Sequence, residues 1–215
     1  MEPITSPQAV SILPTATINP VDSFLTAPAT ALPQGSLVVV SGPSGVGKGT
    51  MLKRIFAKYP DRLVFSISTT TRAPRPNEIH GREYFFTTKE SFIVGKEQGN
   101  FLEWAEYAGN FYGTPRQPVI DNIAAGKVVI LEIELLGARQ VAESFPSARR
   151  IFISPPSLAE LEQRLRSRST DDGAQVAKRL AHAELELAAA SEFDQIIVND
   201  DLDQATMLLE QAIFA

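Results

Sequence analysis

The residues with the clearest chemical potential form a glycine-rich turn early in the chain. Lys48 closes the segment 42–48, which reads GPSGVGK and follows an apolar run at 37–40. This fits the phosphate-binding pattern GxxxxGK, which lies between a strand and a helix. Glycines let consecutive backbone N–H groups surround an anion, and the lysine brings a full charge to the outer phosphates. The turn predicts an ATP site that consists of Gly42, Pro43, Ser44, Gly45, Val46, Gly47, Lys48, Gly49 and Thr50.

One position in this turn departs from the pattern. The residue after the lysine is normally Ser or Thr, whose hydroxyl binds magnesium. Here that residue is Gly49, and Thr50 follows it. We therefore expect Mg²⁺, bound with ATP, to be coordinated through water, with help from Thr50 and from Glu132.

A second group of basic residues lies on a loop. Arg72 and Arg75 alternate with Pro74 and Pro76. A proline disfavours helical geometry in the residue before it, so the loop is expected to be extended. Planar guanidinium groups suit bidentate binding of phosphate oxygens. The loop therefore indicates a second phosphate site.

Both groups need a scaffold, and the apolar pattern predicts an α/β fold. Short apolar runs at 36–41, 63–67, 128–133, 150–153 and 195–198 indicate strands. Mixed segments at 48–59, 116–125, 137–145, 157–167, 174–191 and 201–213 indicate helices. This alternation is typical of a parallel sheet flanked by helices on both faces, which binds ligands at the carboxyl ends of its strands. The segment 68–115 interrupts the alternation and is a candidate inserted lobe.

Composition excludes several classes of protein. The net charge of −5 argues against a nucleic acid polymer as partner, because such binding needs a basic surplus. There is no cysteine, which fits a reducing compartment, and no apolar run is long enough to span a membrane. We expect a cytoplasmic protein without a membrane partner. Residues 1–34 hold six prolines, many Ser, Thr and Ala, and no basic residue, so we expect a disordered tail.

Taken in order, the motifs resemble those of the guanylate kinase family. They are GPSGVGK, SxSTTTRxPR, GxEY, FLEWAEY and NxYGT, followed by RLxxR and IIVNDDLD. The resemblance runs from about residue 36 to the C-terminus. It implies a P-loop NTPase-type core at 35–66, 118–158 and 184–215, a mixed α+β GMP-binding lobe at 67–117 and a helical lid at 159–183. The implied reaction transfers the γ-phosphate of ATP to GMP, and to dGMP, by direct in-line displacement.

The resemblance also implies roles for individual residues. The GMP phosphate would be bound by Arg72, Arg75, Tyr84 and Tyr112. The guanine would be contacted by Ser68, Glu103, Thr114 and Glu134. Chemistry supports the Glu103 assignment independently, because a carboxylate can accept from both guanine N1–H and N2–H, a donor pair that adenine lacks. The competing interpretation of Glu103, beside Trp104, is an exposed helix face.

Two acids end a strand of buried type. Glu132 and Glu134 lie at i and i+2 in the segment 128–134, so we expect them on one face of the strand. The family more often has Asp at both positions. The alternative is a charged pair that only marks the end of the strand.

The late arginines gain their role from the resemblance. Arg164, Arg168 and Arg179 match lid residues that close over the ATP phosphates, and we expect them to act in catalysis together with Lys48 and Arg72. Arg166 gains no role. Asn199 matches a position near the adenine. His80 and His182 are expected to be structural or solvated, because the sequence suggests no acid beside either.

Two alternatives remain open. A kinase for another small molecule would keep the phosphate loop and change the acceptor pocket. A guanylate kinase-like interaction domain would bind peptides without catalysis, but such domains have typically lost the lysine that is present here as Lys48. The oligomeric state is not predicted.

Overall fold

The computed structural model describes residues 35–167 and 173–215. The segment 1–34, expected to be a disordered tail, and the expected lid residue Arg168 lie outside these ranges. Within them, no helix combines the length and the apolar character needed to cross a membrane. The described part begins one residue before the first strand and contains the strands and helices that the apolar pattern predicts.

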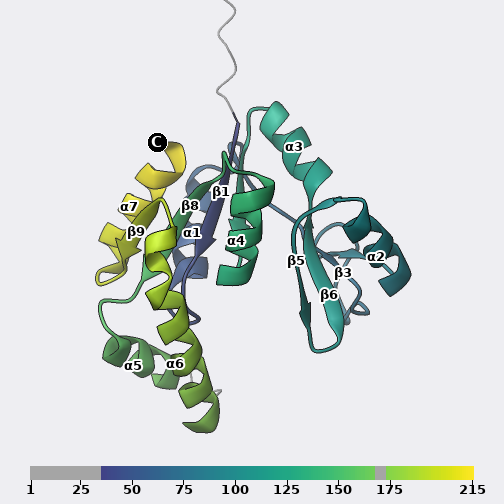
Figure 1. The fold of residues 1–215 in the computed structure, drawn as a ribbon. Coiled ribbons are helices and arrows are strands. Elements are labelled where there is room, and N and C mark those ends of the chain that lie inside the picture. Colours follow the sequence, from purple (N-terminus) through teal and green to yellow (C-terminus); the bar gives the residue numbers. More distant parts are fainter. Residues whose placement is uncertain (1–34, 168–172) are drawn as a thin grey trace, which may run out of the picture. The chain divides into compact units, whose positions relative to one another are not determined.

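Five strands form one parallel sheet in the order β2-β7-β1-β8-β9. β1 lies in the middle, and its residues 37–40 are fully buried because helices cover both faces of the sheet (Figure 1). The predicted α/β architecture is therefore confirmed. The strands are β1 (Ser36–Ser41), β2 (Leu63–Phe65), β7 (Val128–Glu132), β8 (Arg149–Ser154) and β9 (Gln195–Val198).

The side chains of β1 point alternately to two separate hydrophobic cores, as strand geometry requires. Val38 and Val40 pack with residues of α1 and α7 on one face. Leu37 and Val39 pack with residues of α3 and α4 on the other face. These helices are α1 (Lys48–Lys58), α3 (Arg116–Ala124), α4 (Leu135–Ser144) and α7 (Leu202–Phe214).

The prediction that Glu132 and Glu134 share a strand is wrong. β7 ends at Glu132, and Glu134 is the N-cap of α4, with an extended backbone at φ −78° and ψ 168°. The carbonyl of Glu134 already accepts the first helical bond, from Ala138 N–H at 3.0 Å. The helix begins two residues earlier than its pattern suggested, and the two acids therefore belong to different elements.

The inserted segment folds around a second sheet, in the order β4-β3-β6-β5. β5 and β6 form an antiparallel hairpin, whereas β3 and β4 pair in parallel. Phe92 anchors α2 on this sheet by stacking on Phe101 and Phe111, with ring centroids 4.3 and 5.3 Å apart. The elements are β3 (Thr69–Thr70), β4 (Phe85–Phe86), α2 (Lys89–Glu97), β5 (Phe101–Tyr107) and β6 (Asn110–Pro115).

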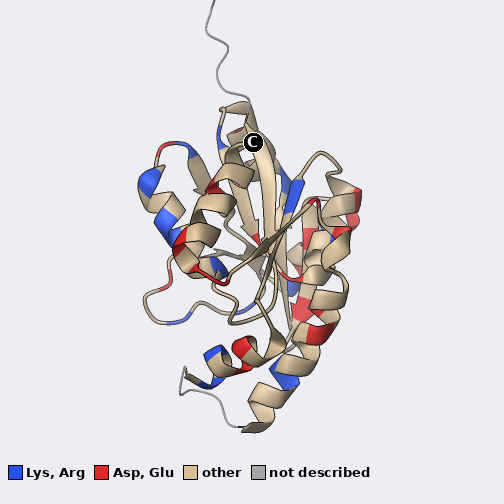
Figure 2. Cartoon of the chain, turned by 90° about the vertical axis from the view of Figure 1, so that its left-hand side faces the viewer, with Lys and Arg blue, Asp and Glu red and all other residues tan. Residues whose placement is uncertain are grey.

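Two further helices, α5 (Leu158–Ser167) and α6 (Gly173–Ala188), pack on one another. Their contact uses one face of α6, on which Val176 and Ala183 are buried and Leu180 is partly buried. Both helices carry acidic and basic residues grouped by sign, with the acids in the first half of α5 and in the second half of α6 (Figure 2). A short 3₁₀ turn, η1 (Ala190–Glu192), links α6 to β9.

Neighbouring isoleucines of β9 provide a test of the core. Ile197 is 2% exposed and belongs to the core under α1 and α7, whereas Ile196 is 47% exposed. We expect Ile197→Ala to lower the free energy of unfolding by about 2–5 kcal/mol, because it leaves a cavity. Ile196→Ala should cost less than about 1 kcal/mol. Urea denaturation followed by circular dichroism measures both, and equal losses would contradict this sheet packing.

Candidate functional site

The glycine-rich turn joins the central strand β1 to α1, as its pattern predicts. Gly42 has a φ of 136°, and a Cβ there would lie 2.2 Å from the carbonyl oxygen of Ile153 on β8. Gly47 has a φ of 105°, and its Cβ would lie 2.6 Å from the Asn199 amide nitrogen. Both positions combine positive φ with a close approach to other atoms, so only glycine fits them without rearrangement.

The turn opens on a hollow of about 390 Å³ at the N-terminus of α1. No side chain caps this helix, and its first turn contains no acid, so the partial positive charge of the helix end is not offset locally. The hollow can therefore accept an anion. It is lined by Ser44, Gly45, Gly47, Lys48, Gly49, Thr50 and Glu132.

Lys48 lies over this turn and donates to the carbonyl oxygens of Gly42 and Pro43. Burial lowers the pKa of its ammonium group below the ordinary value of 10.5, while the nearby charges of three carboxylates raise it. The acids are Glu132, Glu186 and Glu134. The lysine is thus a partly buried cation that is held by protein oxygens and directed at the turn.

A buried carboxylate lies in the inserted lobe. Glu103 is only 8% exposed, and it belongs to β5, which excludes the helical interpretation of this segment. The hydroxyl of Thr114 on β6 donates to its Oε1 at 2.6 Å. Burial raises the pKa of the Glu103 carboxyl above its ordinary 4.5, and the hydrogen bonds from Thr114 partly oppose that effect. An acceptor group poised in this way suits a ligand with N–H donors.

The arginine loop carries a counter-ion that the sequence did not reveal. Arg72 donates to Glu78 Oε1 at 2.9 Å, and its guanidinium lies 5.4 Å from the centre of the Tyr84 ring. Glu78 also accepts from the backbone N–H of Arg75 at 2.7 Å, while the Arg75 side chain is exposed. An acid six residues after an arginine is a weak signal in a charged loop, so only the fold identifies this pair.

The other expected acceptor residues belong to the same lobe as Glu103 and Arg72. Tyr84 and Tyr112 are half-buried and meet edge to face, with ring centroids 6.1 Å apart. Tyr112 also interacts with Arg72. Ser68 is half-buried, and its carbonyl accepts from Phe85 N–H at 2.9 Å. The second sheet therefore brings the loop arginine and both tyrosines together.

α4 fastens the lobe to the central sheet. The Gln140 side chain exchanges two hydrogen bonds with the backbone of Trp104, at 3.0 and 2.9 Å. A Cβ at Gly137 would lie 3.1 Å from Glu103 Oε2, so this helix passes directly beside the buried carboxylate. The same helix begins after Glu134, whose charge acts on Lys48. The Glu103 pocket and the Lys48 turn therefore lie at the same, carboxyl end of β7.

Residues from α5 and β9 support the turn from its other side. The Asn199 side-chain amide donates to the carbonyl of Val46 at 2.7 Å. Arg164 donates to the carbonyl of Asn199 at 3.0 Å and pairs with Glu160 at 2.9 Å. Arg164 and Asn199 also line a hollow of about 270 Å³ beside Gly45 and Gly47. Asn199, expected near the adenine, thus holds the turn itself with its side chain.

α6 approaches the turn with residues of both charges. Arg179 Nη1 donates to the Ser44 hydroxyl at 3.3 Å. The expectation that no acid lies beside His182 is wrong, because its Nδ1 is 3.4 Å from Glu186 Oε2 one helical turn away. Glu186 is 3% exposed, and burial raises the pKa of its carboxyl. His80 is structural, as expected, since its Nδ1 accepts from Phe86 N–H at 3.2 Å.

Oxygen donors at the turn fit a magnesium ion that arrives with a nucleotide. The Thr50 hydroxyl and the Glu132 carboxylate line the same hollow as Lys48. Within residues 35–167 and 173–215 no three His, Asp or Glu side chains form a metal cluster. The hydroxyl and the carboxylate themselves suit Mg²⁺, which usually uses one or two protein oxygens and completes its shell with phosphate oxygens and water.

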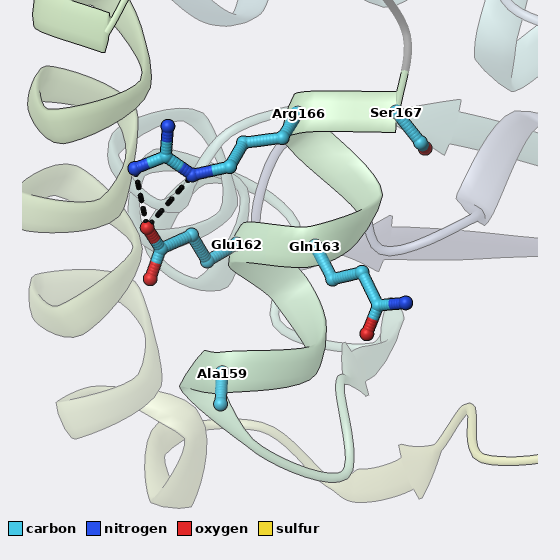
Figure 3. Close-up of a pocket in the computed structure, with 5 residues that line it drawn as sticks. All are labelled: Ala159, Glu162, Gln163, Arg166 and Ser167. Atoms are coloured by element: carbon cyan, nitrogen blue, oxygen red, sulfur yellow. Dashed lines mark hydrogen bonds and ion pairs between the residues drawn. The ribbon is translucent and has the colours of Figure 1, made fainter.

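A hollow on the outer side of α5 is separate from this site. It is lined by Ala159, Glu162, Gln163, Arg166 and Ser167, all from one helix (Figure 3). Arg166 donates twice to Glu162 Oε1, at 2.9 and 2.6 Å. An exposed pair of this kind contributes about 0–1 kcal/mol. Arg166, which received no role from the sequence, has a surface contact here.

The buried carboxyl of Glu103 makes stability depend on pH. Because its pKa is raised in the folded state, the unfolded chain loses this proton first as pH rises from 4.5, and stability falls over that window. We expect Glu103→Gln to remove this loss. Its free energy of unfolding should increase relative to wild type as pH rises above 4.5, as urea titrations without ligand would measure. A constant difference between the two proteins would contradict the assignment.

Comparisons with known proteins point to one family. The family model described as guanylate kinase matches residues 34–215. The guanylate kinase of Thermosynechococcus vestitus is 58% identical over 186 residues, which cover 86% of this chain and 97% of that protein. That of a Synechocystis species is 57% identical, with 84% and 94% covered. The crystal structure of guanylate kinase from Anaplasma phagocytophilum has a TM-score of 0.61 and 32% identity, with 84% and 85% covered. The resemblance seen in the motifs is confirmed, and the chain belongs to the guanylate kinase family.

Proposed function

We propose that this protein transfers the γ-phosphoryl group of ATP to GMP, and to dGMP, to give ADP and GDP. The observation that carries the proposal is the buried Glu103 carboxylate, held by Thr114 at the same end of β7 as Lys48. A triphosphate site and a pocket for a base with N–H donors are thus combined in one chain. The relatives compared above are themselves named guanylate kinases.

Guanine selection follows from the chemistry of Glu103. Its carboxylate accepts the adjacent N1–H and N2–H donors of guanine, while Ser68 and Thr114 supply hydroxyls for O6. Glu134, exposed at the start of α4, is the fourth contact that we assign to the base. Adenine would leave the buried carboxylate without donors, and an unsatisfied buried charge is strongly disfavoured.

The GMP phosphate is assigned to Arg72, Arg75, Tyr84 and Tyr112. Arg72 already has its guanidinium fixed by Glu78 and placed against Tyr84. A phosphate dianion would compete with Glu78 for that guanidinium, because both are oxygen anions that suit the same planar donor pair. Arg75 is exposed and can turn toward a bound phosphate.

ATP is assigned to the turn at 42–50. Backbone N–H groups and Lys48 would bind the phosphates, and Asn199 would border the adenine region. Arg164 and Arg179, which already reach Asn199 and Ser44, would neutralise the phosphates of the transition state together with Arg168. Bound Mg²⁺ would be held by Thr50 and Glu132, partly through water, and would supply further charge compensation.

Transfer needs no general base. A phosphate monoester has a second pKa near about 6, so the attacking oxygen of GMP is already mostly ionised at neutral pH. The protein's task is to align two polyanions, offset their repulsion and exclude water from the transferred group. We therefore expect the lobe at 67–117 and the lid at 159–183 to close over both nucleotides. We expect the enzyme to act in the cytoplasm.

The other candidate functions have less support. A kinase for a different acceptor would not need Glu103, Thr114 and Ser68 together. A non-catalytic interaction domain would not need the cation at the turn, yet Lys48 is present and directed at it. Turnover with GMP, AMP, UMP and dGMP as acceptors separates these functions.

Lys48→Met tests the triphosphate site. Methionine keeps much of the length of the side chain but removes its charge, so kcat/KM for ATP should fall by about 10²-fold or more. Lys53→Met on the exposed side of α1 is the matched control and should retain activity. A coupled assay of ADP release measures both. If Lys48→Met transfers phosphate as well as the control, the assignment of the turn is wrong.

Glu103→Gln tests the acceptor site. Its amide turns a donor toward the guanine N–H groups, so kcat/KM for GMP should fall on the order of 10²-fold. The residual hydrolysis of ATP by the enzyme should be unchanged. The test therefore distinguishes a loss of GMP recognition from a loss of phosphoryl-transfer chemistry. Glu106→Gln on the exposed part of the same strand is the control. If Glu103→Gln kept the wild-type preference for GMP over AMP, the assignment of Glu103 to the guanine pocket would be wrong.

A further inference from the structure

The carboxylate of Glu132 lies where the side chain of residue 49 would point. Apart from the adjacent residues and the backbone of its own helix, a Cβ built on Gly49 has one neighbour within 4 Å among the described residues, the Oε2 of Glu132 at 4.0 Å. A serine hydroxyl on that Cβ would come within hydrogen-bonding reach of this oxygen in the rotamer directed at it. A side chain at residue 49 would therefore project toward the place in the hollow beside Lys48 that the Glu132 carboxylate occupies.

Glu132 is not committed to another partner. Lys48, a cation in its surroundings, donates to the carbonyls of Gly42 and Pro43 rather than to the carboxylate. The charge of Glu132 acts on that lysine only at longer range. No hydrogen bond joins the Glu132 carboxylate to another residue of the described ranges, and the side chain is exposed to the hollow. An acceptor in this position can bind a cation.

A phosphate-binding loop normally provides a hydroxyl for magnesium from the residue after the lysine. Gly49 has none, and Thr50 is one residue further along the helix, so its side chain is rotated by about 100° from the required direction. A carboxylate oxygen is the hard, anionic donor that Mg²⁺ prefers. The length of a glutamate lets it extend from the end of β7 over the helix terminus.

We propose that Glu132 supplies the direct protein ligand for the nucleotide-bound Mg²⁺ in place of the hydroxyl absent at Gly49, so that positions 49 and 132 form one functional unit. This inference rests on the proposed function and goes beyond the water-mediated role expected above, because it makes Glu132 the direct ligand and leaves Thr50 a contact through water. Ligation of the metal by residue 132 requires a side chain as long as that of glutamate. An aspartate in place of Glu132 would be too short to serve, unless residue 49 again carried a hydroxyl.

The test is a double-mutant cycle on metal affinity. Mn²⁺ serves as the spectroscopic probe, and its dissociation constant is measured by electron paramagnetic resonance on the full chain with saturating ADP and without GMP. Glu132→Asp should weaken Mn²⁺ binding by about tenfold or more. Gly49→Ser in that background should restore the affinity to within about threefold of wild type, although the same change in the wild-type background has little effect. ADP affinity in the presence of a chelator should stay constant in all variants.

Glu134→Asp is the matched control. It shortens another acid whose charge acts on Lys48, so a general effect of local charge would weaken Mn²⁺ binding there too, whereas ligation by Glu132 predicts no change. Independent, multiplicative effects of the two substitutions would overturn the proposal, as would unchanged Mn²⁺ affinity in Glu132→Asp. Because the assay contains no GMP, failure of the coupling leaves the GMP-selectivity results of Glu103→Gln untouched, and the reverse also holds.

Discussion

A concentrated negative charge can be held in this protein only because one backbone turn has a fixed shape. The turn between β1 and α1 is packed against the backbone of β8 at Gly42 and against Asn199 at Gly47. Asn199 in turn binds the Val46 carbonyl and is itself bound by Arg164. Distant segments of the chain thus fix the direction of a few N–H groups. A phosphate that binds them does not have to order the loop, so little of its binding energy is lost to conformational entropy.

The carboxylates at the carboxyl end of β7 differ in burial, and we assign them different roles on that basis. Glu103 lies in a buried pocket with a raised pKa, so donors from a ligand are needed to stabilise its charged form. Glu132 and Glu134 are exposed, and their charges act on Lys48. In the proposed function, the buried carboxylate of Glu103 selects the base, whereas the exposed carboxylate of Glu132 balances cations. The parallel sheet brings both tasks to the carboxyl end of β7.

Much of the scaffold could be predicted because parallel strands are continuous apolar runs, as at 37–40 and 128–131. The family also followed from motifs in order. Other features depend on tertiary contacts that no local pattern records. Glu134 continued the pattern of the preceding strand, but its carbonyl accepts the first hydrogen bond of α4. For the FLEWAEY segment that contains Glu103, the sequence offered only a helix as the competing interpretation, whereas its pairing with β6 makes it a strand. Glu78 gains Arg72 as its partner only from the geometry of the loop. The pair of His182 and Glu186, by contrast, is spaced by one turn of the helix predicted at 174–191, so a local pattern could have indicated it.

Before any nucleotide binds, several of the cations assigned to phosphate already have an oxygen partner in the protein. Arg72 is held by Glu78, Lys48 by backbone carbonyls, Arg164 by Glu160 and Arg179 by the Ser44 hydroxyl. Phosphate binding at these residues is therefore an exchange of partners, and its net gain is smaller than the gross strength of the new contacts. Each of these oxygens offsets part of the charge of its cation while no phosphate is bound. It also lets products leave, because the protein oxygens recover the cations as the phosphates depart.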